Sequence, residues 1–248
     1  MALVDGSRPR SRREGADRPW TSEWVHRWDD LTVPPWRDVV RDVGRRLLLP
    51  ALVLWLAILA VGFLIQDGLH SFQSESAVNR ALQSTRTSTW DAVTAVWSHI
   101  GNTEIVIGVC VVMVGVVLAL TRRWSIALVP AIAISLQATV FVVATEIVGR
   151  PRPDVPHLDP APPTSSYPSG HVGASTALYL SLALLAQRVR HPLLRRVLTA
   201  VCVVIPLLVL YARLYRGMHH LTDVLVGLVN GIVCATLAWG YLRERRTR

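Results

Sequence analysis

The sequence predicts an all-α protein built on a six-transmembrane-helix bundle with an N-terminal interfacial helix. The first observation is that 51% of the 248 residues are hydrophobic and gather into runs long enough to span a bilayer. The second is that these runs are continuously apolar rather than alternating, which favours helices over the strands of a membrane barrel. The third is that most Arg residues lie between the runs, where the polar connections should be.

The N-terminal segment, residues 1–46, is predicted to be a cytosolic tail with a Trp-rich amphipathic part. Residues 1–18 are rich in Arg, Ser, Pro and Asp, a composition typical of disorder. Trp20, Trp24 and Trp28 recur every four residues, so a helix would carry three indoles on one side. Trp favours the membrane interface, which predicts an interfacial helix. The alternative is a helix packed on the cytosolic face of the protein itself.

The membrane domain is predicted over residues 47–242. Its six apolar runs are at about 47–65, 100–120, 124–148, 172–187, 197–214 and 221–242. The fourth run is short for a bilayer at ~1.5 Å per residue, so we expect it to include flanking residues. Residues 66–99 predict one or two short helices on the membrane surface, and residues 149–170, with seven of the 15 Pro, predict a stiff irregular loop. Residues 243–248 form a basic tail.

The charges predict the orientation. The net charge is +9 and all 26 basic residues are Arg. Of these, 20 lie before the first run, in alternate loops or after the last run, and six lie in the other segments. The positive-inside rule then places both termini in the cytosol of a cell whose plasma or inner membrane holds the protein. A basic chain can also bind nucleic acid, but Arg between membrane runs indicates lipid headgroups and topology instead.

Three polar motifs lie at the edges of apolar runs. They are Arg150-Pro151-Arg152-Pro153, Tyr167-Pro168-Ser169-Gly170-His171 and Arg213-Leu214-Tyr215-Arg216-Gly217-Met218-His219-His220-Leu221-Thr222-Asp223. Arg152 and Arg213 are the first candidates for holding a phosphoryl group, because guanidinium is planar and always charged. A charge beside a membrane run needs a partner, which a phosphate would supply. The alternative is that they are topology anchors, and this alternative is stronger for Arg150 and Arg216.

The second motif opens the fourth run. A helix start offers unpaired N–H groups and the positive end of the helix dipole, which attract anions. Ser169 can cap this helix and donate to a phosphate oxygen, and Gly170 lets the backbone approach closely. His171 then lies at the mouth of the site, where an imidazole can protonate a departing alkoxide and later accept a proton from water.

The third motif carries a His and an Asp on one helical face. His219 and Asp223 are four residues apart, so the carboxylate can accept from one ring nitrogen and leave the other free to attack. The alternative is that Asp223 only caps the helix. His220 is a competing imidazole, because it lies three residues from Asp223 and the spacing alone does not exclude it.

Taken together, these residues resemble the type-2 phosphatidic acid phosphatase (lipid phosphate phosphatase) superfamily, in its integral membrane branch. That family carries a Lys-six-residues-Arg-Pro motif, a Pro-Ser-Gly-His motif and a Ser-Arg-five-residues-His-three-residues-Asp motif, in this order. The sequence matches them with Arg152-Pro153, with Pro168 to His171, and with Arg213, His219 and Asp223. The resemblance covers roughly residues 50–242.

The resemblance implies a six-helix fold with its site on the outer face. His219 would form a phosphohistidine, Asp223 would orient it and His171 would protonate the leaving group. Phosphate would be bound by Arg152, Ser169, Gly170 and Arg213. No metal and no cofactor is implied, since Arg and N–H donors neutralise the charge.

Two positions depart from the family pattern. Thr145 stands where the family has Lys, and Ala212 stands where it has Ser. The first change removes a cation from the phosphate cradle, at a cost on the order of 1.5–3 kcal/mol for a charge-assisted contact. Arg150 or Arg216 is the hypothetical replacement.

The predicted function is hydrolysis of a phosphomonoester or diphosphate of a lipid at the extracytoplasmic face. Candidate substrates are phosphatidate, a polyprenyl diphosphate and phosphatidylglycerol phosphate. One alternative is a phosphotransferase that passes the phosphoryl group to an alcohol. Another is a non-catalytic anion-binding transporter.

Overall fold

The structure is a computed structural model that describes residues 35–68, 72–161 and 163–242. Within these ranges every regular element is helical, so the all-α prediction is confirmed. The predicted interfacial helix around Trp20, Trp24 and Trp28 lies outside the described residues, as do the tails at residues 1–18 and 243–248.

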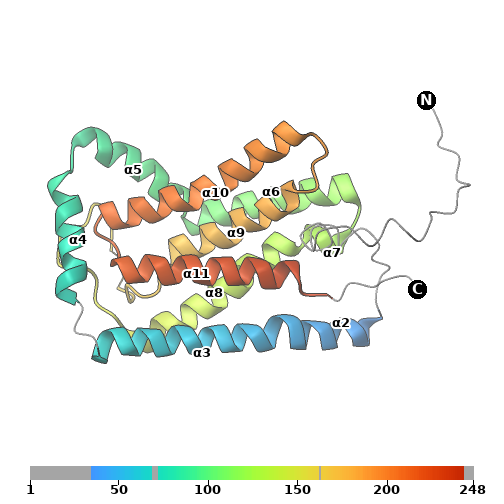
Figure 1. Cartoon of the computed structure of the whole chain (residues 1–248), viewed down its shortest axis with the longest axis horizontal. Coiled ribbons are helices and arrows are strands. Elements are labelled where there is room, and N and C mark those ends of the chain that lie inside the picture. The colour runs from blue at the N-terminus through green and yellow to red at the C-terminus, as the bar shows by residue number, and fades with distance from the viewer. Residues whose placement is uncertain (1–34, 69–71, 162, 243–248) are drawn as a thin grey trace, which may run out of the picture. The chain divides into compact units, whose positions relative to one another are not determined.

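Five helical segments of the described chain are long and apolar enough to cross a membrane. They are the continuous helix Trp36–Gln66, α6 (Thr103–Thr121), α8 (Val129–Val148), α10 (Pro192–Tyr215) and α11 (Leu221–Trp239). The sixth predicted span is the shorter apolar helix α9 (Gly170–Ala186). These six segments agree with the predicted bundle, which Figure 1 shows as a set of roughly parallel helices.

The first helix begins earlier than the apolar run predicts. It contains α2 (Trp36–Val43), the π-helical turn η1 (Gly44–Leu48), α3 (Leu49–Phe63) and a second π-helical turn, η2 (Leu64–Gly68). Pro35 precedes its first residue and sets the start. The Arg residues of α2 are good helix formers, so the helix continues through the polar stretch that hydropathy alone would exclude.

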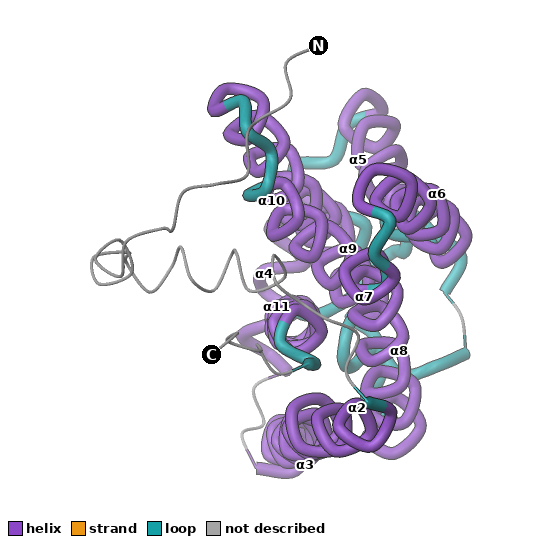
Figure 2. The backbone as a smooth tube through the Cα atoms, turned by 90° about the vertical axis from the view of Figure 1, so that its right-hand side faces the viewer, coloured by secondary structure: helices purple, strands orange, loops and turns teal. Residues whose placement is uncertain are grey.

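Helix α9 lies at the centre of the bundle. It packs against α8, α10 and α11, and Figure 2 shows it between its neighbours. Small residues permit this approach: a Cβ atom at Gly231 of α11 would come within 2.6 Å of the Gly173 carbonyl oxygen. A helix that faces protein on several sides needs less apolar surface, which explains why the fourth run is short.

The third run is interrupted near its start. The short helix α7 (Trp124–Ala127) ends at Leu128, and α8 begins at Val129 with Pro130 in its first turn. Pro is tolerated at that position because its missing N–H would have no helical partner there.

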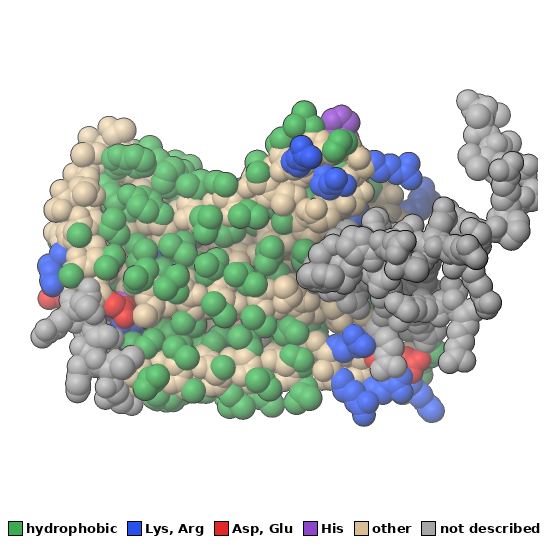
Figure 3. Space-filling view, viewed as in Figure 1, with side chains coloured by type: hydrophobic (Ala, Val, Ile, Leu, Met, Phe, Trp, Pro, Cys, Tyr) green, Lys and Arg blue, Asp and Glu red, His purple; other side chains and the backbone are tan. Residues whose placement is uncertain are grey.

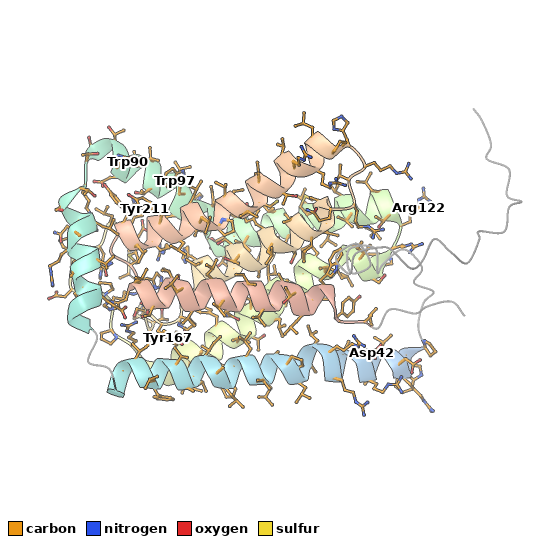
Figure 4. The ribbon with its side chains drawn as sticks, in the orientation of Figure 1. Asp42, Trp90, Trp97, Arg122, Tyr167 and Tyr211 are labelled. Carbon is orange, nitrogen blue, oxygen red and sulfur yellow. The ribbon has the colours of Figure 1, made fainter. Side chains whose placement is uncertain are left out.

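Two short helices occupy the segment between the first two spans, as predicted. They are α4 (Phe72–Ser84) and α5 (Ser88–Ile100), and Figure 1 shows α4 across the end of the bundle. Edge-to-face contact between Trp97 and Tyr211 joins α5 to α10, as Figure 4 shows. Asn79 of α4 donates to the backbone oxygen of His219 at 3.1 Å. Both helices therefore contact the segments that carry the polar motifs.

The polar motifs converge at one end of the bundle. The chain leaves α8 after Val148 and enters α9 at Gly170, and it leaves α10 after Tyr215 and enters α11 at Leu221, all at the end that α4 crosses. Figure 3 shows Arg side chains gathered at the other end, where α2 begins. The two ends of the described bundle thus differ: the polar motifs lie at one end, and Arg side chains gather on the surface of the other.

Candidate active site

One cavity of about 410 Å³ brings together the groups that the three motifs supply. Arg152, His171, Arg213 and His219 all line it, together with Gly170. They come from the loop after α8, the start of α9, the end of α10 and the turn before α11. Residues up to 67 positions apart in sequence therefore face a single space.

The imidazole of His219 is held by a backbone carbonyl. Its Nδ1 atom lies 2.7 Å from the oxygen of Ser166, whereas the nearest carboxylate oxygen of Asp223 is 3.9 Å away. A carbonyl oxygen only accepts, so Nδ1 carries the proton and Nε2 keeps a lone pair in the neutral ring. Burial lowers the pKa of His219 well below its ordinary value, and the charges of Arg213 and Arg152 lower it further.

The segment that supplies the Ser166 carbonyl is itself anchored. Tyr167 is fully buried, and its hydroxyl donates to the backbone oxygen of Ile58 in α3 at 2.7 Å. Figure 4 shows Tyr167 between the bundle end and α3. The Ser166 hydroxyl donates to the Pro151 oxygen at 2.8 Å. These bonds fix the loop from two sides.

Asp223 does not make the expected hydrogen bond to His219. Its Oδ2 atom accepts from the backbone N–H of His220 at 2.8 Å, which caps α11. Its Oδ1 atom accepts from Arg150 Nη1 at 2.5 Å. The direct contacts of Asp223 therefore match the alternative prediction, in which this carboxylate caps the helix. His220 does not line the cavity, and burial, with the charge of Arg150, lowers its pKa to about 4.

Arg150 lies in a buried ion network rather than in the cavity. Its side chain is 0% exposed and also donates to Thr222 at 2.6 Å and to Glu75 at 3.2 Å. Arg150 thus does not take the place of the family's Lys. Thr145, which stands at that position, donates to the Tyr167 oxygen at 3.4 Å.

A second carboxylate, Asp159, pairs with two cations of the third motif. Its Oδ2 atom lies 2.9 Å from Arg213 Nη1, and its Oδ1 atom lies 2.8 Å from Arg216 Nε. Ser98 of α5 donates to Asp159 at 3.0 Å. Burial raises the pKa of Asp159, but the hydrogen bond from Arg216, the charges of Arg213 and Arg216 and the Ser98 bond together lower it. Arg216 is therefore bound to protein and lies outside the cavity lining.

Four buried donors at or beside the cavity have no hydrogen-bond partner among the described residues. Three belong to the motifs: Nε of Arg152 and Nε of Arg213, whose side chains line the cavity, and the hydroxyl of Ser169, which is next to Gly170; the fourth is Nε2 of Gln137. Ser169 precedes α9 but its side chain does not cap it, contrary to expectation. A buried unpaired donor costs about 1–3 kcal/mol, so three donors together at one place match the requirements of an anion with several oxygens.

His171 is oriented by a residue that the sequence does not single out. Its Nε2 atom lies 3.0 Å from Asn102 Oδ1, and the amide nitrogen of Asn102 lies 2.9 Å from Nδ1 of His99. Asn102 precedes α6, and its side-chain type carries no signal for this role in the sequence. His99 and Asn102 also line a wider cavity of about 830 Å³ that shares His171 and Arg213 with the first.

The far wall of the 410 Å³ cavity is apolar. It is formed by side chains of α6, α8 and α9, among them Val106, Ile107, Ala138, Phe141, Val142 and Ala174. A cavity that combines cationic side chains with an apolar wall suits an amphiphilic ligand. Across the described residues, no group of three His, Cys, Asp or Glu side chains is arranged to hold a metal ion.

Two solved structures share this fold. A transmembrane PAP2-type phosphatidylglycerolphosphate phosphatase from Bacillus subtilis matches with a TM-score of 0.68 and 23% identity, covering 77% of this chain and 94% of that one. LpxE from Aquifex aeolicus matches with a TM-score of 0.53 and 21% identity, over 65% and 92%. No curated protein matches the sequence. The PAP2 superfamily model matches residues 123–247, half of the chain, and the protein therefore belongs to the PAP2 superfamily.

Proposed function

We propose that the protein is a membrane phosphatase that hydrolyses a phosphomonoester or diphosphate of a lipid through a phosphohistidine. The observation that carries the proposal is the single cavity in which Arg152, Arg213, His171 and His219 meet an apolar wall between membrane helices. Family membership supports the reaction type.

Each polar group has a role in this proposal. Arg152, Arg213, Ser169 and the Gly170 backbone hold the phosphate oxygens. Nε of both Arg residues and the Ser169 hydroxyl have no partner among the described residues, and Gly170 is the first residue of α9, where helix N–H groups attract anions. A Cβ atom at Gly170 would come within 2.7 Å of the Phe141 ring, so glycine keeps this approach open.

The reaction proceeds in two displacements. Nε2 of His219 attacks phosphorus, the bond between phosphorus and the lipid oxygen breaks, and His171 gives the leaving alkoxide its proton. His171 then removes a proton from water, the hydroxide attacks phosphorus, and the bond between phosphorus and His219 breaks. Inorganic phosphate leaves and both imidazoles return to their starting state.

We place the cavity at the extracytoplasmic face of the plasma or inner membrane. The excess of Arg at the opposite end of the bundle supports this orientation through the positive-inside rule. In this orientation a lipid in the outer leaflet can place its phosphate at the Arg pair while its chains stay beside α6 and α8.

The test is phosphate release from phosphatidate, polyprenyl diphosphate and phosphatidylglycerol phosphate in detergent micelles, with and without chelator. We expect release from at least one lipid, unchanged by chelator, and loss to background in His219→Ala. His157→Ala is the matched control, because His157 lies in the loop between α8 and α9, its ring hydrogen-bonds to the Pro153 oxygen at 3.1 Å, and it does not line the cavity. An acid-labile 32P label that stays on the wild-type enzyme and is missing from His219→Ala identifies the intermediate. A fully active His219→Ala variant refutes the proposal and favours a non-catalytic anion-binding protein.

The wider cavity beside His171 favours one second candidate function. At about 830 Å³ it can admit an alcohol as well as water, and an alcohol would make the protein a phosphotransferase. Adding glycerol or inositol to the phosphatase assay separates the two functions. Transfer would produce a phosphorylated alcohol at the expense of free phosphate.

A further inference from the structure

Gln137 lines the catalytic cavity but has no part in the chemistry proposed above. It lies in the middle of α8, is 1% exposed, and its Nε2 group has no hydrogen-bond acceptor among the described residues. An unpartnered amide buried in an apolar place is unfavourable, because it has lost its hydrogen bonds to water and gained none in return. A polar side chain at such a position therefore calls for a partner that the described part of the chain does not provide.

The position of Gln137 relative to the phosphate groups is defined by α9. The amide packs directly over Gly173, where a Cβ atom would collide with Nε2. Gly173 lies three residues beyond Gly170, which is ~4.5 Å farther along the helix axis at 1.5 Å per residue. Gln137 is thus about one helical turn deeper in the membrane than the phosphate-binding end of the cavity.

The surroundings of this amide are apolar. Ile134, Ala138 and Phe141 of α8, with Val106 of α6 and Ala174 of α9, form the wall around it. The last torsion of a Gln side chain is broad and roughly two-fold, so its N–H can turn toward the cavity that the side chain lines. Ser135 is the other polar residue that this part of α8 places in the cavity lining. An unpaired amide donor in a mostly apolar wall selects for a ligand with an acceptor at that depth.

We infer that Gln137 binds an acyl ester carbonyl of the substrate and so makes a diacylglycerol phosphate of the phosphatidate class the preferred lipid. This inference rests on the proposed phosphatase function. In phosphatidate the ester carbonyls follow the phosphate after only the glycerol carbons, which places a carbonyl near one turn of depth. A polyprenyl chain has no acceptor there. In phosphatidylglycerol phosphate the terminal phosphate is separated from the esters by a second glycerol and a phosphodiester.

A purely structural role for this amide is less consistent with its contacts. The bond that joins α8 to α11 here uses the backbone oxygen of Gln137, which accepts from Asn230 Nδ2 at 3.5 Å. A Gln137→Met variant keeps that backbone oxygen and an unbranched side chain of similar length, and it removes only the amide.

The experiment compares diacyl phosphatidate with its dialkyl ether analogue, which has the same headgroup and chains but no carbonyl. With the wild-type protein in micelles, we expect kcat/KM to be about two- to tenfold higher for the ester, the range for one hydrogen bond. Gln137→Met should lower the ester value to the ether value and leave the ether value unchanged. Gln187→Met is the matched control, because Gln187 bonds Thr199 at the other end of α9 and should keep the ester preference.

Each other outcome overturns the inference. Equal wild-type rates on ester and ether overturn it and leave the phosphatase proposal standing, and this measurement needs no variant to fold. An equal loss on both lipids in Gln137→Met assigns the amide a structural role instead. A higher kcat/KM on polyprenyl diphosphate than on phosphatidate also contradicts it. If no lipid phosphate is released at all, the proposed function fails, and the inference with it.

Discussion

His219 donates from Nδ1 to the carbonyl oxygen of Ser166 at 2.7 Å, and Asp223 stands 3.9 Å from the same nitrogen. The tautomer that leaves Nε2 free is therefore set by a backbone group, which cannot be removed by a side-chain substitution. The Asp223 carboxylate instead caps α11 and neutralises Arg150. These two facts separate the orientation of the His219 ring from the stability of the fold.

The first prediction follows from that separation. Asp223→Asn should lower the free energy of unfolding by about 3 kcal/mol, since it leaves Arg150 buried with one partner fewer. Its kcat should fall less than that of His219→Ala, because Ser166 still holds the ring. Thermal unfolding in detergent and kcat on the purified variants check both parts. An Asp223→Asn protein that is as stable as the wild type but as inactive as His219→Ala would contradict the argument.

The second prediction concerns the protonation of His219. Its pKa is lowered by burial and by Arg213 and Arg152, so the ring stays neutral below the ordinary His pKa of about 6.5. Removing a cation favours the imidazolium, so Arg152→Gln should raise the pKa of His219. Histidine 15N NMR across a pH series measures this directly, with His219→Gln to assign the signal. A wild-type midpoint at or above the ordinary value is the contrary result.

A third prediction concerns the carboxylate that pairs with Arg213. Asp159 lies where its negative charge opposes a phosphate, so Asp159→Asn should lower the inhibition constant of inorganic phosphate by about fivefold, or ~1 kcal/mol. Asp154→Asn is the matched control, because Asp154 is an exposed acidic residue of the same loop. An unchanged or higher inhibition constant in Asp159→Asn, with Asp154→Asn like the wild type, would show that the carboxylate helps binding.

The ion pairs of Asp159 also predict how the stability of the folded protein changes at acid pH. Its folded pKa is lowered by its Arg partners, so it binds fewer protons in the folded state than in the unfolded state. Its stabilising contribution is therefore present above the unfolded Asp pKa of about 3.9 and is lost as the pH falls through the lower folded value. Thermal midpoints from pH 7 to pH 3 should drop less steeply in Asp159→Asn than in the wild type. Parallel curves would argue against this linkage.

The last prediction tests Asn102 as a positioning residue for His171. Asn102→Ala should reduce kcat by about two- to tenfold, the range for loss of one hydrogen bond, while KM changes little. Restoring an amide oxygen with Asn102→Gln should recover part of the rate. The split between kcat and KM distinguishes this role from loss of phosphate binding, which would raise KM instead.

The sequence predicts the bundle well because hydropathy and length report directly on membrane spans. It also names four residues, Arg152, His171, Arg213 and His219, that the fold brings to one cavity. Their types and spacing are unusual at the edge of a membrane run, which is why they stand out.

The supporting residues are not predictable in the same way. Asp159 and Asn102 contact the motifs across 54 and 69 positions, and their residue types are common in loops. Ser166 acts through its carbonyl, which every residue has. Arg150 stands beside Arg152 in the same motif, yet it points into a buried network because Glu75 of α4 provides its partner.

Helix α4 lies beyond the membrane spans, yet it supplies Glu75 to Arg150 and Thr222, and Asn79 to the backbone of His219. Hydrogen bonds and an ion pair therefore join the segment between the first two spans to the start of α11. A chimera that exchanged this segment with that of a relative would have to carry the matching residues at 150 and 222 with it, and evolution of this segment is constrained by the same three-way match.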